Sequence, residues 1–142
     1  MIALPAEDTL MVLVAGEQTG GRFAIIEARE WQGTEPPSHI HSREDEFIFV
    51  LEGRLVIEQD GEQFDRASGT GMYLPRGSEH SFRVESPEAR LLVTYSPAGL
   101  ERCLRELAQQ DGTGPECQHV ERMVGIAARF GVTITGPARP PP

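Results

Sequence analysis

The sequence predicts an all-β domain of the sandwich or barrel type, followed by two helices. Short apolar or alternating runs recur between residues 10 and 95, and turn-forming residues separate them. Beyond residue 96 the apolar residues change to helical spacing. The 142 residues, of which 39% are hydrophobic, suffice for one domain with a core of its own.

The predicted strands are short, and Gly, Pro and Asp-Gly turns stand between them. Such regular spacing is typical of sandwiches and barrels. Within the series, the Gln-Asp-Gly-Glu segment at 59–62 predicts a tight hairpin. We expect the aromatic residues Trp31, Tyr73 and Tyr95 to lie in the core. The predicted strands are Leu10–Ala15, Arg22–Ala28, Glu46–Leu51, Arg54–Glu58, Gly71–Leu74, Ser81–Val84 and Arg90–Tyr95.

Two helices are predicted after the last strand, packed outside the barrel. The first begins near Pro97, and the second runs from about Glu116 to Phe130 and ends at Gly131. We therefore expect a barrel over residues 1–96, a helical extension of the same domain over 97–131, and an extended or disordered Pro-rich tail over 132–142. The predicted apolar faces are Leu100, Cys103, Leu104, Leu107 and Ala108 in the first helix, and Val120, Val124, Ala127 and Ala128 in the second.

Charge and composition argue against two classes of partner. The formal charge is −9 and no block of Lys or Arg is present, so neither nucleic acid nor an anionic membrane surface is an expected partner. No apolar stretch approaches the length of a membrane span, and residues 1–17 lack the features of a signal peptide.

Cys103 and Cys117 form no C-x-x-C motif, and we interpret them as reduced thiols of a cytoplasmic protein.

Two of the four histidines, His39 and His41, are separated by a single residue. On a strand, residues i and i+2 point to the same face, with Cα atoms about 6.6 Å apart. This spacing suits two nitrogens that bind one ion. Two solvated surface histidines would have the same spacing, so the pair alone does not decide between the two interpretations.

The residues around this pair form two clusters with fixed spacing. They resemble the paired motifs of the cupin superfamily, G-x5-H-x-H-x4-E-x6-G and G-x5-P-x-G-x2-H. All nine fixed positions are present, and fifteen residues separate the two clusters. The resemblance covers about residues 20–95, and the helical C-terminus is similar to that of small quercetinase-like cupins. The matching residues are Gly33, His39, His41, Glu46 and Gly53, then Gly69, Pro75, Gly77 and His80.

The resemblance implies a jelly-roll β-barrel (a double-stranded β-helix), a homodimer, and a site for one divalent metal ion. The ion would be iron, nickel, copper, manganese or zinc, since three imidazoles and one carboxylate suit these metals. Glu46 is either a ligand or a catalytic base. The implied ligands are His39, His41, Glu46 and His80.

Residues next to these ligands carry further expectations. Phe82 shares the inward face of His80 and is predicted to line the substrate pocket. Val84 occupies a position where cupins usually carry Asn, which puts the hydrogen bonding around the ligands in doubt. Glu44 and Asp45 are expected to be solvated loop charges.

Three functions agree with the resemblance. The first, which we favour, is a metal-dependent dioxygenase that acts on a small aromatic or enolic compound. The second is a redox-neutral metal enzyme, such as a polyketide cyclase, an isomerase or a decarboxylase. The third is a small-molecule-binding module without turnover. The complete ligand set argues against the third, because a binding barrel has no need of metal ligands.

Overall fold

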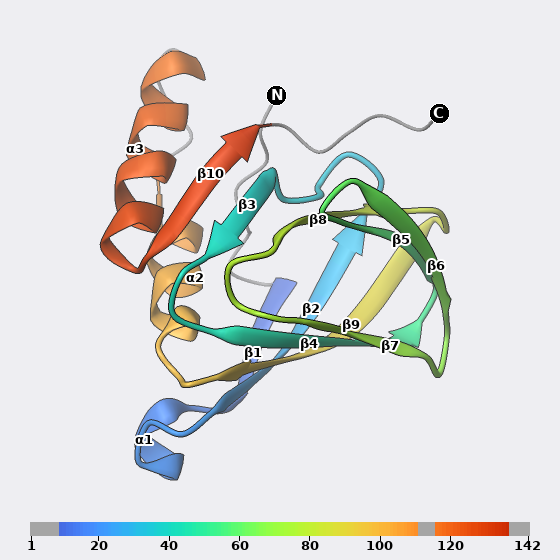
Figure 1. The fold of residues 1–142 in the computed structure, drawn as a ribbon, viewed down its shortest axis with the longest axis horizontal. Helices are drawn as coiled ribbons and strands as arrows, with labels where there is room; N and C mark the ends of the chain where they lie inside the picture. Colours follow the sequence, from blue (N-terminus) through green and yellow to red (C-terminus); the bar gives the residue numbers. More distant parts are fainter. Residues whose placement is uncertain (1–8, 111–115, 137–142) are drawn as a thin grey trace.

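The computed structural model describes residues 9–110 and 116–136, in which two five-stranded antiparallel sheets pack against each other (Figure 1). This is the predicted all-β jelly roll. The first sheet has the order β1 (Leu10–Val14), β2 (Ala24–Trp31), β9 (Glu88–Ser96), β4 (Asp45–Glu52) and β7 (Gly71–Leu74). The second has the order β10 (Val132–Gly136), β3 (Ser38–His41), β8 (Glu79–Val84), β5 (Arg54–Gln59) and β6 (Glu62–Ala67).

Alternation along the strands builds the core between the sheets. On β9, Leu91, Val93 and Tyr95 are buried while the residues between them are half-buried. Burying one such aliphatic side chain contributes about 1.5–3 kcal/mol to the free energy of unfolding. Register also matters for function, because Tyr95 lies opposite Glu46 of β4. A slip of β9 by one residue would turn Tyr95 to the outer face and away from Glu46.

Three strands lie where no separate strand was predicted. β3 carries the two spaced histidines, and β6 is an edge strand whose sequence, EQFDRA, has little apolar content to mark it. β10 covers the first five residues of the predicted tail and pairs with β3. The rest of that tail, residues 137–142, lies outside the described residues.

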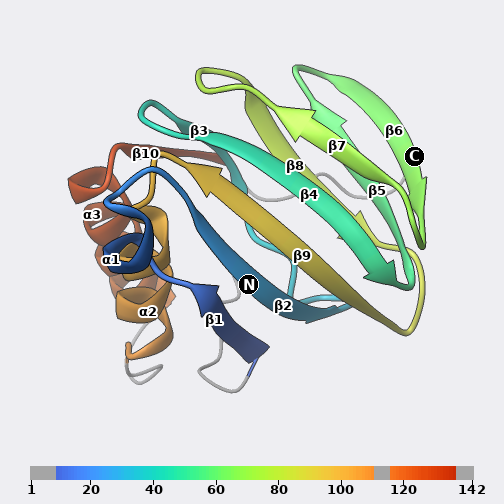
Figure 2. The same cartoon turned by 90° about the horizontal axis from the view of Figure 1, so that it is seen from below.

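The helices gather on one side of the two sheets (Figure 2). They are α1 (Gly16–Thr19), α2 (Leu100–Ala108) and α3 (Glu116–Arg129), and the two C-terminal helices were predicted. The buried face predicted for α3 was right at Ala127 but wrong at Val124, which is 39% exposed, while Met123 and Ile126 are buried. None of the described helices is long and apolar enough to cross a membrane.

Glu101 connects α2 to the segment between β1 and β2. It is fully buried, and its carboxylate accepts hydrogen bonds from the backbone N–H groups of Gly99 (2.6 Å) and Gly16 (2.8 Å). Charge-assisted bonds of this kind are shorter and stronger than neutral ones. At Gly16 a Cβ would lie 2.7 Å from the Cβ of Ala98, so this close approach of the two segments requires glycine.

The outer face of the first sheet carries exposed apolar side chains. They are Met11 (59% exposed) and Leu13 on β1, Phe47 on β4, and Tyr73 (57% exposed) on β7. Tyr73 was expected in the core and lies on the surface instead. Exposed apolar side chains favour contact with a partner, and β1 is an edge strand whose unpaired backbone groups do the same. We therefore propose that two copies of the chain pair through this face.

Light scattering at micromolar concentration should accordingly give twice the 15.6 kDa mass of one chain. Combining Leu13→Lys with Phe47→Lys should shift the protein to the monomer, because pairing would bury two unpaired charges. Val124→Lys removes an exposed apolar residue on α3 and should leave the dimer intact. A wild-type protein with the mass of one chain would contradict the proposal.

Candidate metal centre

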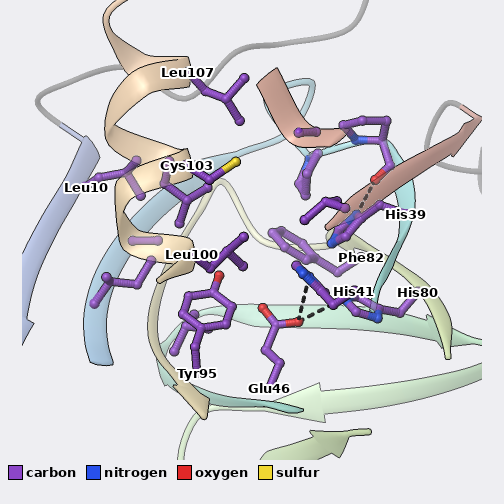
Figure 3. Close-up of a pocket in the computed structure, with 18 of the residues that line it drawn as sticks. Leu10, His39, His41, Glu46, His80, Phe82, Tyr95, Leu100, Cys103 and Leu107 are labelled. Atoms are coloured by element: carbon purple, nitrogen blue, oxygen red, sulfur yellow. Dashed lines mark hydrogen bonds and ion pairs between the residues drawn. The ribbon is translucent and has the colours of Figure 1, made fainter. Parts of the chain in front are cut away.

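Four side chains from both sheets converge between the sheets (Figure 3). His39 and His41 come from β3 and His80 from β8, and the strand register sets His39 directly opposite His80. Glu46 comes from β4 in the other sheet. Each residue offers one ligand atom, and these atoms all lie within 4.8 Å of one another. The structure thus brings together the four residues that the sequence pattern singled out.

Glu46 is the hub of this cluster. Its Oε2 lies 2.8 Å from Nε2 of His80 and 3.8 Å from Nε2 of His41. The ring of His39 meets the other two rings edge-on, with centroids 4.7 Å from His41 and 4.4 Å from His80. The Nε2 atoms of His41 and His80 therefore face a common point beside the carboxylate.

Burial and mutual charge set the protonation of the cluster. Burial raises the pKa of Glu46, but the contact with His80 and the charges of the imidazoles outweigh it and lower that pKa to about 2. Burial, together with repulsion from the other two rings, lowers the pKa of His39 to about 3, and burial also lowers that of His41. For His80, burial lowers the pKa, but the Glu46 carboxylate outweighs it and raises the pKa. The cluster holds one carboxylate and at least two neutral imidazoles.

The residues present fit one divalent ion. Among the described residues, no hydrogen bond reaches either ring nitrogen of His41, although both are buried, and Oε2 of Glu46 has Nε2 of His80 as its close partner. Buried polar atoms without partners are costly and rare, unless a bound group satisfies them. Imidazole nitrogens and a carboxylate oxygen are the ligands that first-row divalent metals prefer. His39, His41, Glu46 and His80 would hold such an ion.

The second nitrogen of His39 already has a partner. Its Nδ1 donates to the backbone carbonyl of Pro37 at 2.7 Å, which leaves Nε2 unprotonated and free to bind a metal. Val84, at the position where cupins usually carry Asn, is buried and apolar. It supplies no side-chain hydrogen bond to the ligands.

A cavity of about 130 Å³ adjoins the cluster, with walls that are mostly apolar. Phe82 lies in its wall, as does Tyr95, which was expected only as a core residue. Burial and the adjacent Glu46 carboxylate raise the pKa of Tyr95 well above its usual value. The helices contribute as well, since Leu100, Cys103 and Leu107 of α2 point toward the cavity (Figure 3). These helices were expected only to pack outside the barrel, and their part in the pocket wall is not visible from their apolar spacing.

The pocket-lining thiol of Cys103 is free and buried, as predicted for a reduced cysteine. Burial and nearby acidic groups raise its pKa to about 12, so it behaves as a neutral apolar group. The side chain of Cys117 lies outside the described part of the structure.

Glu44 differs from the expectation of a solvated loop charge. It is only 4% exposed, and its Oε1 lies 3.9 Å from Nδ1 of His41. Asp45 does lie at the surface, where it accepts hydrogen bonds from Arg76. Strand alternation carries no information inside the turn between β3 and β4, so the sequence held no signal that separated the two acids.

A second carboxyl group lines the cavity away from the cluster. Glu30 of β2 is half-buried, and Thr34 Oγ1 donates a hydrogen bond to its Oε2 at 2.9 Å. Burial raises the pKa of Glu30 to about 7; the Thr34 hydroxyl opposes this shift and the charge of Glu35 adds to it. Near neutral pH the cavity thus has an ionisable group in addition to the metal-binding cluster, in a wall that is mostly apolar.

Replacing a ligand should remove the metal. In His41→Ala or His80→Ala, loss of one of four ligands opens the coordination shell to water, so metal content measured by elemental analysis should fall severalfold. His119→Ala removes a histidine of α3 outside the cluster and should leave the metal content unchanged. Full occupancy in both ligand variants would rule out this ligand set.

The variant Glu46→Gln distinguishes two roles of this residue. The amide keeps a neutral oxygen in place but cannot take up a proton at neutral pH. Near-normal metal content with lost activity would identify Glu46 as a base, whereas metal loss would identify it as a ligand.

Glu30 predicts a pH-dependent stability. Its pKa is higher in the folded state (about 7) than the ordinary value of 4.5, so between these values the folded state binds more protons and stability falls as pH rises. Glu30→Gln removes the ionisable group and with it this loss of stability at higher pH. Its melting temperature relative to wild type should therefore increase from about pH 5 to about pH 8. Glu121→Gln, at an exposed position, should follow wild type at both pH values. If the melting temperature of Glu30→Gln differed from that of wild type by the same amount at about pH 5 and at about pH 8, the raised pKa of Glu30 would be refuted.

Comparison with known proteins gives consistent matches. The sequence profile of the cupin domain family matches residues 27–95. The chain is 36% identical over 88 residues to quercetin 2,3-dioxygenase from Bacillus subtilis. The matched segment covers 62% of this chain and 26% of that protein. It is 34% identical over 90 residues to polyketide synthase CurC from Streptomyces cyaneus. This matched segment covers 63% of this chain and 57% of that protein. The chain thus spans about a quarter and just over half of the length of these two relatives.

A solved structure agrees with these matches. It is a sugar phosphate isomerase of the cupin superfamily from Silicibacter pomeroyi, with a TM-score of 0.52 and 28% identity, and the match covers 63% of this chain and 60% of that one. The nine motif positions, the two antiparallel sheets and the family profile all point the same way. The chain belongs to the cupin superfamily.

Proposed function

We propose that this chain is a metal-dependent cupin enzyme, and specifically a dioxygenase that acts on a small aromatic or enolic compound. The observation that carries the proposal is the position of the four ligands, which lie in the wall of a mostly apolar cavity. A metal site that opens into an apolar cavity suits an organic substrate that coordinates through oxygen. The similarity to the Bacillus subtilis quercetin 2,3-dioxygenase supports the same class of reaction.

Cavity size favours a small substrate. The volume of about 130 Å³ is close to the roughly 150 Å³ of an apolar protein cavity that binds benzene. A compound with one ring therefore fits, in contact with Leu100 and Leu107 of α2, which line the cavity.

The residues of the chain would divide the work. A redox-active ion held by the four ligands would supply the electrons and the spin pathway that dioxygen chemistry needs. Glu46 would serve either as the fourth ligand or as the base that accepts the proton of an enol or phenol as the substrate binds. Phe82 and the apolar side chains of α2 would hold the ring and keep water away from the reacting atoms.

A redox-neutral reaction is the second candidate. The similarity to polyketide synthase CurC and to the sugar phosphate isomerase favours it. In this case the ion would act as a Lewis acid that polarises a carbonyl group, and the same cavity would hold the substrate. The two candidates differ in their need for dioxygen and for a redox-active metal.

Metal replacement tests the proposal. Protein purified without a histidine tag is first analysed for its native metal, and oxygen uptake is then followed with catechol-like and flavonol enols. Zinc in place of the native metal should abolish turnover, because zinc has no accessible redox state. Phe82→Ala should raise KM for the ring compound while the metal content stays unchanged. Full turnover with zinc under strict anaerobiosis would overturn the dioxygenase and support the redox-neutral enzyme.

A further inference from the structure

A second carboxylate, Glu44, is buried behind the metal-binding cluster. It lies in the turn between β3 and β4 and is 4% exposed, although Arg43 on one side of it is exposed and Asp45 on the other is bonded to Arg76. Within the described part of the chain, no hydrogen bond reaches its Oε1. A buried carboxylate oxygen without a partner is costly, so a function for this side chain is expected.

The ring of His41 lies between two carboxylates. Its Nε2 faces Oε2 of Glu46 at 3.8 Å, and its Nδ1 faces Oε1 of Glu44 at 3.9 Å. Both ring nitrogens are buried and lack a hydrogen-bond partner among the described residues. Since Nε2 faces the other ligand atoms, Nδ1 is the rear nitrogen, and Glu44 supplies the acceptor nearest to it.

His39 shows the effect of a hydrogen-bond partner at the ring nitrogen that does not face the other ligand atoms. Its Nδ1 donates to the Pro37 carbonyl, which fixes the ring and leaves Nε2 unprotonated. Metal-binding histidines generally have a partner of this kind, and a carboxylate is a common one. For His41 the gap of 3.9 Å exceeds a hydrogen bond by about 1 Å, so the contact requires the two side chains to approach each other by that distance.

We propose that Glu44 is the positioning residue of His41. When Nε2 of His41 binds the ion, Oε1 of Glu44 accepts the N–H of Nδ1, which fixes both the tautomer and the orientation of the ring. Glu44 does not touch the ion or the substrate. The inference rests on the metal centre of the proposed function, and it holds whether that centre reacts with dioxygen or acts as a Lewis acid.

Binding of Co²⁺ tests this role without reference to activity. Glu44→Leu replaces the carboxylate by an apolar group of similar size and should weaken Co²⁺ affinity about 10–100-fold in a chelator competition. It should also shift the visible absorption of bound Co²⁺, because the ring of His41 is no longer held. Glu44→Gln should recover much of the affinity, since its amide oxygen can accept the same N–H.

Two further comparisons separate positioning from general effects. In the His41→Ala background, Glu44→Leu and Glu44→Gln should bind Co²⁺ equally, because the ring through which Glu44 acts is gone. Asp45→Asn removes one negative charge at the adjacent residue and should leave affinity unchanged. Thermal unfolding of the metal-free variants shows whether each of them folds.

The outcomes distinguish this inference from the proposed function. Wild-type Co²⁺ affinity in Glu44→Leu would overturn the positioning role alone. The same holds if, in the His41→Ala background, Glu44→Leu still bound Co²⁺ more weakly than Glu44→Gln by the same factor. Failure of the wild-type protein to bind Co²⁺ would overturn the metal centre and the positioning role together. Normal Co²⁺ behaviour with no oxygen uptake by the native enzyme would overturn only the dioxygenase.

Discussion

Glu46 carries a negative charge in a place that water hardly reaches, and three imidazole rings from the opposite sheet surround it. A buried charge is tolerable only when nearby groups of opposite or polarisable character compensate it. Both sheets must therefore keep their relative position, because the electrostatic compensation weakens as the atoms separate. Strand register, core packing and the helical cover can all be understood as means of keeping this carboxylate beside His41 and His80.

The helical cover has a second consequence for the chemistry of the cavity. Leu100, Cys103 and Leu107 turn one face of α2 into part of the pocket wall, and Glu101 binds that helix to the backbone at Gly16. Metal ligands, apolar wall and cover thus come from different regions of the chain. Changes in α2 can alter which molecules fit without altering the ligands, so one fold with the same ligand set could serve different substrates.

Much of this arrangement could be predicted from the sequence, because fixed spacing and strand parity are local properties. Strand alternation correctly predicted that His39 and His41 point to the same face, and that Phe82 lies on the same side of its strand as His80. Prediction failed where local pattern carries no information. Glu44 lies in a turn, β6 is a polar edge strand, and on α3 two apolar stripes compete. Of these two neighbours Met123 is buried and Val124 is exposed, a choice that depends on how the helix packs against the rest of the fold.

Strand β3 has only four residues, and its two neighbours are β8 and β10. β10 lies far along the chain, yet its residues Val132 and Ile134 are the register partners of His41 and His39. During synthesis the two histidines emerge from the ribosome early, but their strand gains its second neighbour only after both C-terminal helices have been made. The site is therefore a late product of folding, and metal acquired before that stage would meet an incompletely supported pair of ligands.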